Sequence, residues 1–174
     1  MALLKTHYYG GIKKYQWPTV PLAIHGVIYD TEGKQREIVI GEEENDPVFV
    51  ISDLLPHLAK DQMVKKMTEG IEGESLNVLI GGMPIEAEDV KETVKFSVLK
   101  MLNARYGITE ESFISAEIEI VPAQKAKNVG LDESFVGAYG QDDRVCAYTT
   151  LRGILDVEAP KTTAVAILVD KEEI

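Results

Sequence analysis

The sequence predicts an α+β protein in two parts, and two observations carry this prediction. Short strand-like runs separated by turns fill the first 120 or so residues, around a single long helical repeat. After Pro122 the pattern changes to a helix followed by a wholly apolar run, which is typical of an α/β sheet. We therefore expect a mainly β domain with packed helices, a boundary at about residues 122–133, and then part of an α/β domain.

The first elements are predicted to be an irregular segment and a β-hairpin. Residues 5–17 are rich in Tyr, Gly and Lys and indicate a loop or an irregular strand pair. The apolar runs 22–29 and 36–40 flank a turn at residues 30–33, which is the pattern of a hairpin. A third strand is expected at residues 48–51, after an acidic stretch that is most simply a solvated turn.

The middle of the chain is predicted to alternate helices and strands. Residues 52–67 have a helical pattern, although Pro56 limits its first turn, and residues 75–80 indicate a strand. The clearest helix covers residues 86–106 and ends before Gly107. Its apolar residues recur at steps of three and four and should face the core: Val90, Val94, Val98, Met101 and Leu102. Alternation over residues 113–121 predicts a half-buried strand, with Ile114, Ala116, Ile118 and Ile120 inward.

The last part of the chain is predicted to be an incomplete piece of a sheet domain, without the elements that would cover its strand. Residues 122–133 have no period and indicate a linker, and a helix carrying Val145 and Leu155 follows residue 140. Residues 164–169 are wholly apolar, which predicts a strand buried on both faces. Nothing else in the sequence could cover such a strand, so we expect the chain to be a truncated piece of a larger domain.

Composition excludes several classes of protein. The 29 acidic and 18 basic residues give a net charge of -11, which disfavours binding to nucleic acid. No apolar run approaches the roughly 20 residues that cross a bilayer, and no secretory signal is visible. The lone Cys146 cannot form an internal disulfide, and we expect an inert core thiol in a cytoplasmic protein.

Two acidic clusters are the candidate sites on chemical grounds. Residues 141–144 begin the late helix, and residues 170–173 follow the apolar run. Functional groups in open α/β sheets gather beyond the carboxyl ends of strands and in loops that enter helices. Carboxylates there suit a divalent ion that activates water. A helix cap and a solvated tail are the simpler interpretations of the same residues.

Several motifs resemble one family of dinuclear zinc peptidases. Residues 137–149, GAYGQDDRVCAYT, and residues 167–173, ILVDKEE, are similar to two signatures of the aspartyl aminopeptidase (vacuolar aminopeptidase I) family. The motif YGGI at residues 9–12, the following Trp17, and ISDLLPHL at residues 51–58 also resemble it. The resemblance runs in order along nearly the whole chain, but it covers only the middle of the family's longer sequence.

The resemblance implies a role for each residue of the acidic clusters. Asp142 matches the carboxylate that bridges two Zn²⁺ ions, and Asp143 would orient it. Glu172 matches the general base that takes a proton from water, and Glu173 matches a terminal zinc ligand. The implied reaction is metal-assisted hydrolysis of the N-terminal peptide bond of peptide substrates.

Other parts of the family's site are missing from the sequence. The family's first zinc ligand lies in a His-x-Asp motif, which none of the histidines His7, His25 and His57 begins. Only two of the five expected protein ligands are present, so we expect the isolated chain to be inactive. His57 instead matches a histidine that enters a neighbouring subunit's active site and stabilises an oxyanion. From the sequence alone, a surface residue or a satisfied core residue is the simpler interpretation of His57, and we interpret His7 and His25 as structural.

The resemblance also implies that residues 1–125 are an inserted dimerisation, or lid, domain and that residues 126–174 are part of the catalytic domain. It implies homo-oligomers, in which the inserted domain forms dimers and the dimers form a dodecamer. Two alternatives remain open on the sequence. The chain could be an oligomerisation module without catalysis. It could also be a small protein that holds one divalent ion at Asp142 and Glu173.

Overall fold

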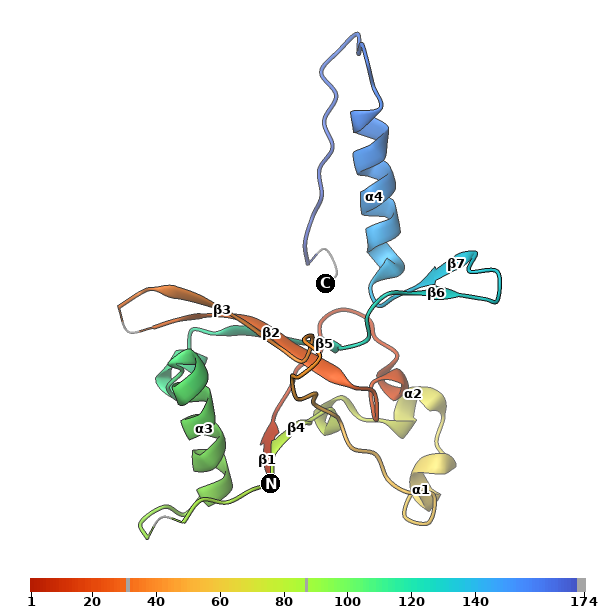
Figure 1. Ribbon diagram of the computed structural model, residues 1–174. Coiled ribbons are helices and arrows are strands. Elements are labelled where there is room, and N and C mark those ends of the chain that lie inside the picture. Colours follow the sequence, from red (N-terminus) through yellow and green to blue (C-terminus); the bar gives the residue numbers. More distant parts are fainter. Residues whose placement is uncertain (31, 87, 172–174) are drawn as a thin grey trace. The chain divides into compact units, whose positions relative to one another are not determined.

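The computed structural model describes residues 1–30, 32–86 and 88–171, and it divides the chain into two compact units, Met1–Ala123 and Gln124–Ile174 (Figure 1). Helices and small sheets occur together, which confirms the predicted α+β class. No helix in the described parts of the chain is long and apolar enough to span a bilayer. The two units are described separately below.

The larger sheet of the first unit has three antiparallel strands in the order β3-β2-β5. Strand β2 (Leu22–Tyr29) and strand β3 (Gln35–Ile40) form the predicted hairpin. Asp30 shapes its turn, because the Asp30 Oδ1 atom accepts the backbone N–H of Lys34 at 2.9 Å and of Glu32 at 3.1 Å.

Strand β5 (Glu117–Pro122) completes this sheet and pairs with β2 from Leu22↔Pro122 to Val27↔Glu117. The prediction started this strand four residues too early. Residues Glu111–Phe113 form a 3-10 turn, η3, and Ile114 is 87% exposed instead of facing inward. Side-chain alternation therefore identified the strand but not its beginning.

A second sheet pairs the N-terminal strand β1 (Ala2–Leu4) with β4 (Val78–Gly81). The sequence did not predict β1, because three residues carry no measurable period. The 3-10 turn η2 (Gly73–Ser75) precedes β4, which begins later than predicted. The strand expected at residues 48–51 contributes only two isolated bridges, from Phe49 to Leu22 and from Val50 to Leu79. Residues 5–17 are irregular apart from the 3-10 turn η1 (Lys14–Gln16).

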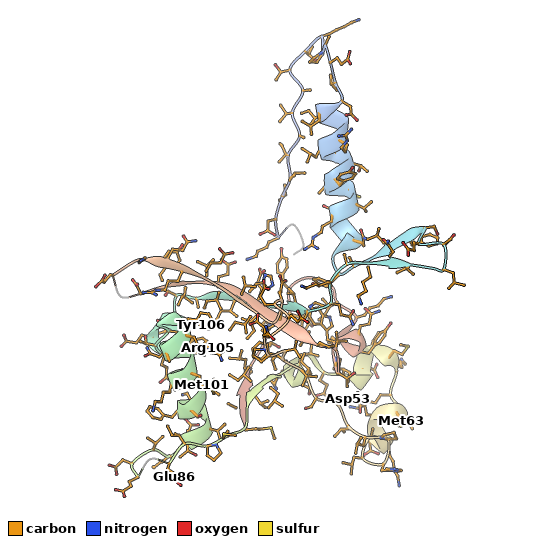
Figure 2. The ribbon with its side chains drawn as sticks, in the orientation of Figure 1. Asp53, Met63, Glu86, Met101, Arg105 and Tyr106 are labelled. Atoms are coloured by element: carbon orange, nitrogen blue, oxygen red, sulfur yellow. The ribbon has the colours of Figure 1, made fainter. Side chains whose placement is uncertain are left out.

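Helix α3 (Thr93–Tyr106) begins seven residues later than predicted. The segment before it turns back, with the Ile85 backbone N–H donating to the Thr93 carbonyl at 3.4 Å. Gly107 ends the helix in the left-handed conformation, with φ 68°, as the sequence predicts. Val98 is buried, but Met101 is 51% exposed and was wrongly assigned to the core stripe (Figure 2).

The helix predicted over residues 52–67 is wrong. Only two single turns form there, α1 (Lys60–Met63) and α2 (Met67–Gly70). Pro56 disfavours helical geometry in the residue before it, and residues 56–58 form a turn instead.

Two clusters of buried side chains form the core of the first unit. One lies between the three-stranded sheet and α3 and is built on these residues: Ile24, Ile28, Ile38, Ile40 and Ile108. The other joins β2 to β4 through these residues: Leu22, Ile51, Leu76 and Val78. Each such side chain contributes about 1.5–3 kcal/mol by leaving water, so the first unit has a core of its own.

The second unit has a hairpin where the sequence predicted a linker. Strands β6 (Lys127–Val129) and β7 (Phe135–Gly137) pair antiparallel. The predicted helix is present as α4 (Gln141–Leu155). Cys146 is exposed on it, so the prediction of a core thiol is wrong.

The strand predicted at residues 164–169 is also absent. These residues are extended but unpaired, and Val165 and Ile167 are 73% and 75% exposed. None of the described residues from 124 to 171 is buried. A strand needs neighbours on both edges and faces to be buried, and this unit supplies none to the apolar run.

Candidate functional site

The Asp142 and Asp143 pair lies where β7 leads into α4. Gly140, at the N-cap, has φ 74°, a left-handed conformation that favours glycine. Asp142 has a ψ of 108°, outside the helical range, so regular helix begins after it. The peptide bond between Asp142 and Asp143 is cis.

Two neighbouring side chains tie this junction to the preceding backbone. The Gln141 Nε2 atom donates to the Val136 carbonyl at 3.1 Å. The Arg144 Nη1 atom donates to the Tyr139 carbonyl at 3.2 Å. Sequence reasoning noticed both residues as members of the acidic cluster but gave them no role, because their polar groups do not reveal a backbone partner.

The carboxylates of Asp142 and Asp143 are exposed, and neither makes a hydrogen bond or ion pair with another described side chain or backbone group. Carboxylate oxygens are ordinary zinc ligands, so the donor type fits the metal. Within the described ranges no three His, Cys, Asp or Glu residues come together to hold an ion. Glu172 and Glu173 lie outside the described residues. The described residues therefore do not form a complete zinc site around the Asp142 and Asp143 pair.

His57 lies far along the chain from this pair, in an exposed loop of the first unit, residues 53–59, which we call the His57 loop. Ala59 is buried and anchors the end of the loop, and its backbone N–H donates to the Leu55 carbonyl at 3.0 Å. Large apolar side chains on both sides of His57 are exposed, with Leu55 at 67% and Leu58 at 71%. The His57 loop thus exposes an imidazole between large apolar side chains.

A groove of about 440 Å³ runs between the His57 loop and helices α1 and α2. Apolar side chains, including Ile51 and Ile71, line part of it. The Asp53 Oδ1 atom accepts the Gln62 side-chain N–H at 3.0 Å and the Leu54 backbone N–H at 2.8 Å. The bond from Gln62 holds Asp53, the first residue of the loop, against α1. Figure 2 labels Asp53, and Met63 at the end of α1.

The other two histidines make contacts within the first unit. The His25 Nε2 atom lies 2.8 Å from the Glu42 Oε1 atom. The ring of His7 stacks on Tyr8 with centroids 5.8 Å apart, and the Lys14 ammonium lies 5.9 Å from the centre of the same Tyr8 ring. These contacts orient both imidazoles within their own unit.

Comparison with protein families matches the whole chain, residues 1–174, to the aminopeptidase I zinc metalloproteases (M18). The chain belongs to this family. The resemblance in the sequence is therefore confirmed at the level of the family.

Two curated relatives from the M18 family share more than half of the aligned residues with this chain. An M18 family aminopeptidase 1 from Clostridium acetobutylicum is 55% identical over 174 residues, which are all of this chain and 37% of the relative. One from Borrelia garinii subsp. bavariensis is 56% identical over 176 residues, covering all of this chain and 38% of the relative. The chain thus spans less than two fifths of the length of these relatives.

Solved structures of the M18 family show the same fold. The crystal structure of an M18 aminopeptidase from Thermotoga maritima superposes with a TM-score of 0.84 at 55% identity, over 90% of this chain and 34% of that one. The aminopeptidase I structure from Clostridium acetobutylicum gives a TM-score of 0.80 at 54% identity, with the same coverage.

Proposed function

We propose that these residues are the central segment of a zinc-dependent aminopeptidase that hydrolyses N-terminal peptide bonds with a water activated by two metal ions. The observation that carries this proposal is the M18 match, which occupies every residue of the chain yet little more than a third of its relatives. The second unit supports it, because a part of the chain with no buried described residue needs further polypeptide to complete its core.

Each residue of the acidic clusters has a role in this proposal. Zinc, when bound, supplies a Lewis acid and lowers the pKa of a coordinated water. Asp142 would bridge the two ions, since each of its carboxylate oxygens can serve one. Glu173 would be a terminal ligand. Glu172 would accept the proton of the attacking water as a general base and later donate it to the leaving amine. The support for these roles is the sequence resemblance together with the unengaged carboxylate of Asp142.

The two units would have different functions, one in dimerisation and the other in catalysis. Residues 1–125 would be the dimerisation, or lid, domain, and residues 126–174 the first part of the returning catalytic domain. The first unit supports this with two buried clusters of its own, as expected for an inserted domain that folds independently.

His57 would act in the active site of a neighbouring subunit, where it would stabilise the developing oxyanion. Its exposed loop with apolar flanks is a surface suited to burial against a partner. Assembly into dimers, and of dimers into a dodecamer, would then be a condition of catalysis.

The central test compares the 174-residue chain with the full-length protein on amino-acid nitroanilides supplied with zinc, manganese or cobalt. We expect no turnover by the chain alone. We expect turnover by the full-length protein that is abolished in Glu172→Gln without loss of bound zinc. Robust hydrolysis by the isolated chain, lost in its own Glu172→Gln variant, would contradict the proposal that its site is incomplete.

Mixing two inactive full-length variants tests the role of His57. A Glu172→Gln subunit carries an intact His57, and a His57→Ala subunit carries an intact Glu172. If His57 acts across the interface, random dimers of the two restore about a quarter of the wild-type activity, because half are mixed and each has one complete site. Mixtures that remain inactive after subunit exchange would overturn action in trans.

A second candidate is an oligomerisation module without catalysis. It is favoured by the lack of a three-ligand group in the described residues. Light scattering separates it from a passive fragment: the module should self-associate, and a strictly monomeric 174-residue chain over a wide concentration range would count against it.

A further inference from the structure

We infer that Gln141 and Arg144 are positioning residues that hold Asp142 in place for a metal ion. This inference rests on the proposed role of Asp142 as a zinc ligand. It goes further because it assigns a task to two polar side chains that ligate nothing themselves. The observations that carry it are the contacts on either side of the Asp142 and Asp143 pair.

The side chains of Gln141 and Arg144 donate hydrogen bonds to two different backbone carbonyls in the segment before α4. Gln141 reaches back to the Val136 carbonyl in strand β7, at 3.1 Å. Arg144 reaches back to the Tyr139 carbonyl in the connecting turn, at 3.2 Å, and its own backbone N–H lies 3.3 Å from the Gly140 carbonyl. The aspartate pair therefore lies between two side-chain-to-backbone hydrogen bonds, which we call the tethers from Gln141 and Arg144.

The Arg144 guanidinium donates to a backbone carbonyl although the carboxylates of Asp142 and Asp143 lie just before it in the sequence. No ion pair joins Arg144 to Asp142 or Asp143 among the described residues. An arginine paired with Asp142 would compete with a metal for the carboxylate oxygens. The observed contact instead orders the backbone, and no other described residue occupies those oxygens, which is the arrangement that a metal ligand needs.

Gly140 contributes to the same arrangement, because its position faces the Arg144 guanidinium. A Cβ atom at this position would lie 3.4 Å from the Arg144 Cζ atom and 3.6 Å from its Nε atom, and φ is 74°. The guanidinium thus packs over a residue without a side chain. A larger residue at position 140 would strain the backbone because of the positive φ, although its Cβ atom would only touch Arg144 at ordinary contact distance.

The test uses the full-length protein with the variants Arg144→Ala, Arg144→Lys and Gln141→Ala. The matched control is Arg152→Ala, which removes an arginine from the same helix, where it pairs with Asp156 at 2.8 Å. Zinc affinity is measured by competition with a chromophoric chelator. The visible spectrum of the cobalt-substituted protein reports the geometry of the ligands.

We expect Arg144→Ala and Gln141→Ala each to weaken zinc binding about 10- to 100-fold and to change the cobalt spectrum. Arg144→Lys, which keeps a donor, should restore part of the loss, and Arg152→Ala should match the wild type. Unchanged affinity and an unchanged spectrum in Arg144→Ala would overturn the inference, as would an equal loss in Arg152→Ala.

Hydrogen exchange separates a failure of this inference from a failure of the proposed function. In the metal-free protein, Arg144→Ala should speed exchange of the amides at residues 137–144 and leave the amides near Arg152 unchanged. A wild-type protein that binds no zinc would overturn the proposed function. Exchange at residues 137–144 that does not respond to Arg144→Ala would overturn the tether itself.

Discussion

The contact between β4 and α3 gives the sharpest prediction about stability. A Cβ atom added at Gly81 in β4 would lie 2.5 Å from the Val98 Cγ2 atom in α3, much closer than two carbon atoms can approach. Val98 cannot swing away easily, because a valine in a helix has one strongly preferred χ1 rotamer. The Gly81→Ala variant must therefore move the helix, the strand or both.

The expected cost of Gly81→Ala follows from these constraints. Overpacking a core costs about 1–3 kcal/mol. Replacing glycine also restricts the unfolded chain, which offsets about 0.4–1 kcal/mol. We expect a net loss of about 1–2 kcal/mol in the free energy of unfolding. Val98→Ala alone should cost about 1.6 kcal/mol for its two methyl groups, plus a cavity term. In the double variant the new methyl group fills the vacated space, so the two losses should fall short of additivity by about 1–2 kcal/mol.

Urea unfolding of the 174-residue chain, followed by tryptophan fluorescence, measures these values. Trp17 is the single tryptophan and packs against the cluster that contains β4, so the signal reports the first unit. The matched control is the neighbouring Gly82→Ala, where a Cβ atom meets nothing within 4 Å. A loss in Gly82→Ala as large as that in Gly81→Ala, or strictly additive losses in the double variant, would refute the packing argument.

Three further predictions concern single residues of the first unit. Gly107→Ala should cost about 1 kcal/mol in thermal unfolding, because the C-cap of α3 has φ 68°. Hydrogen bonds from backbone N–H groups, first that of Gly41, lower the pKa of Asp46, which NMR titration should detect. The stability that this carboxylate contributes should be fully present above the ordinary carboxyl pKa and be lost as pH falls through the lowered pKa. Unfolding of Asp46→Asn at the same pH values should not show this loss. The Glu110 carboxylate accepts a 2.7 Å hydrogen bond from the Lys95 ammonium and raises the pKa of Lys95. The stability difference between the wild type and Lys95→Met in urea unfolding should therefore be full below the ordinary lysine pKa and be lost as pH rises through the raised pKa.

The parts of the fold that local signals determine could be predicted. The β2–β3 hairpin followed from two apolar runs and a turn that contains Asp30. Gly107 marked the end of α3 because only a residue that tolerates positive φ suits that cap. Helix α4 was visible from its spacing of apolar residues. In each case the information lies within a few residues of the element.

The parts that depend on distant partners could not be predicted. Strand β1 is three residues long and is defined only by its pairing with β4, more than 70 positions away. The apolar residues 164–169 have the composition of a buried strand, but no strand forms without neighbours. Pro56 disfavours a continuous helix over residues 52–67, where only two single turns form.

The candidate site divides in the same way. Asp142 was found because an acidic pair before a helix is conspicuous, and the resemblance gave it a role. The tethers from Gln141 and Arg144 end on backbone carbonyls, which no side-chain pattern can reveal. Glu172 and Glu173 remain predictions from the sequence.

The position of β2 at the centre of its sheet determines when that sheet can close during synthesis. One neighbour, β3, emerges from the ribosome almost at once, but the residue that pairs with Leu22 on the other side is Pro122, which is translated 100 residues later. At about 5–20 residues per second the open edge of the hairpin stays unpaired for about 5–20 s. An unpaired β-edge is a template for pairing with other chains, so slowing translation within this interval should raise the tendency of the nascent chain to aggregate.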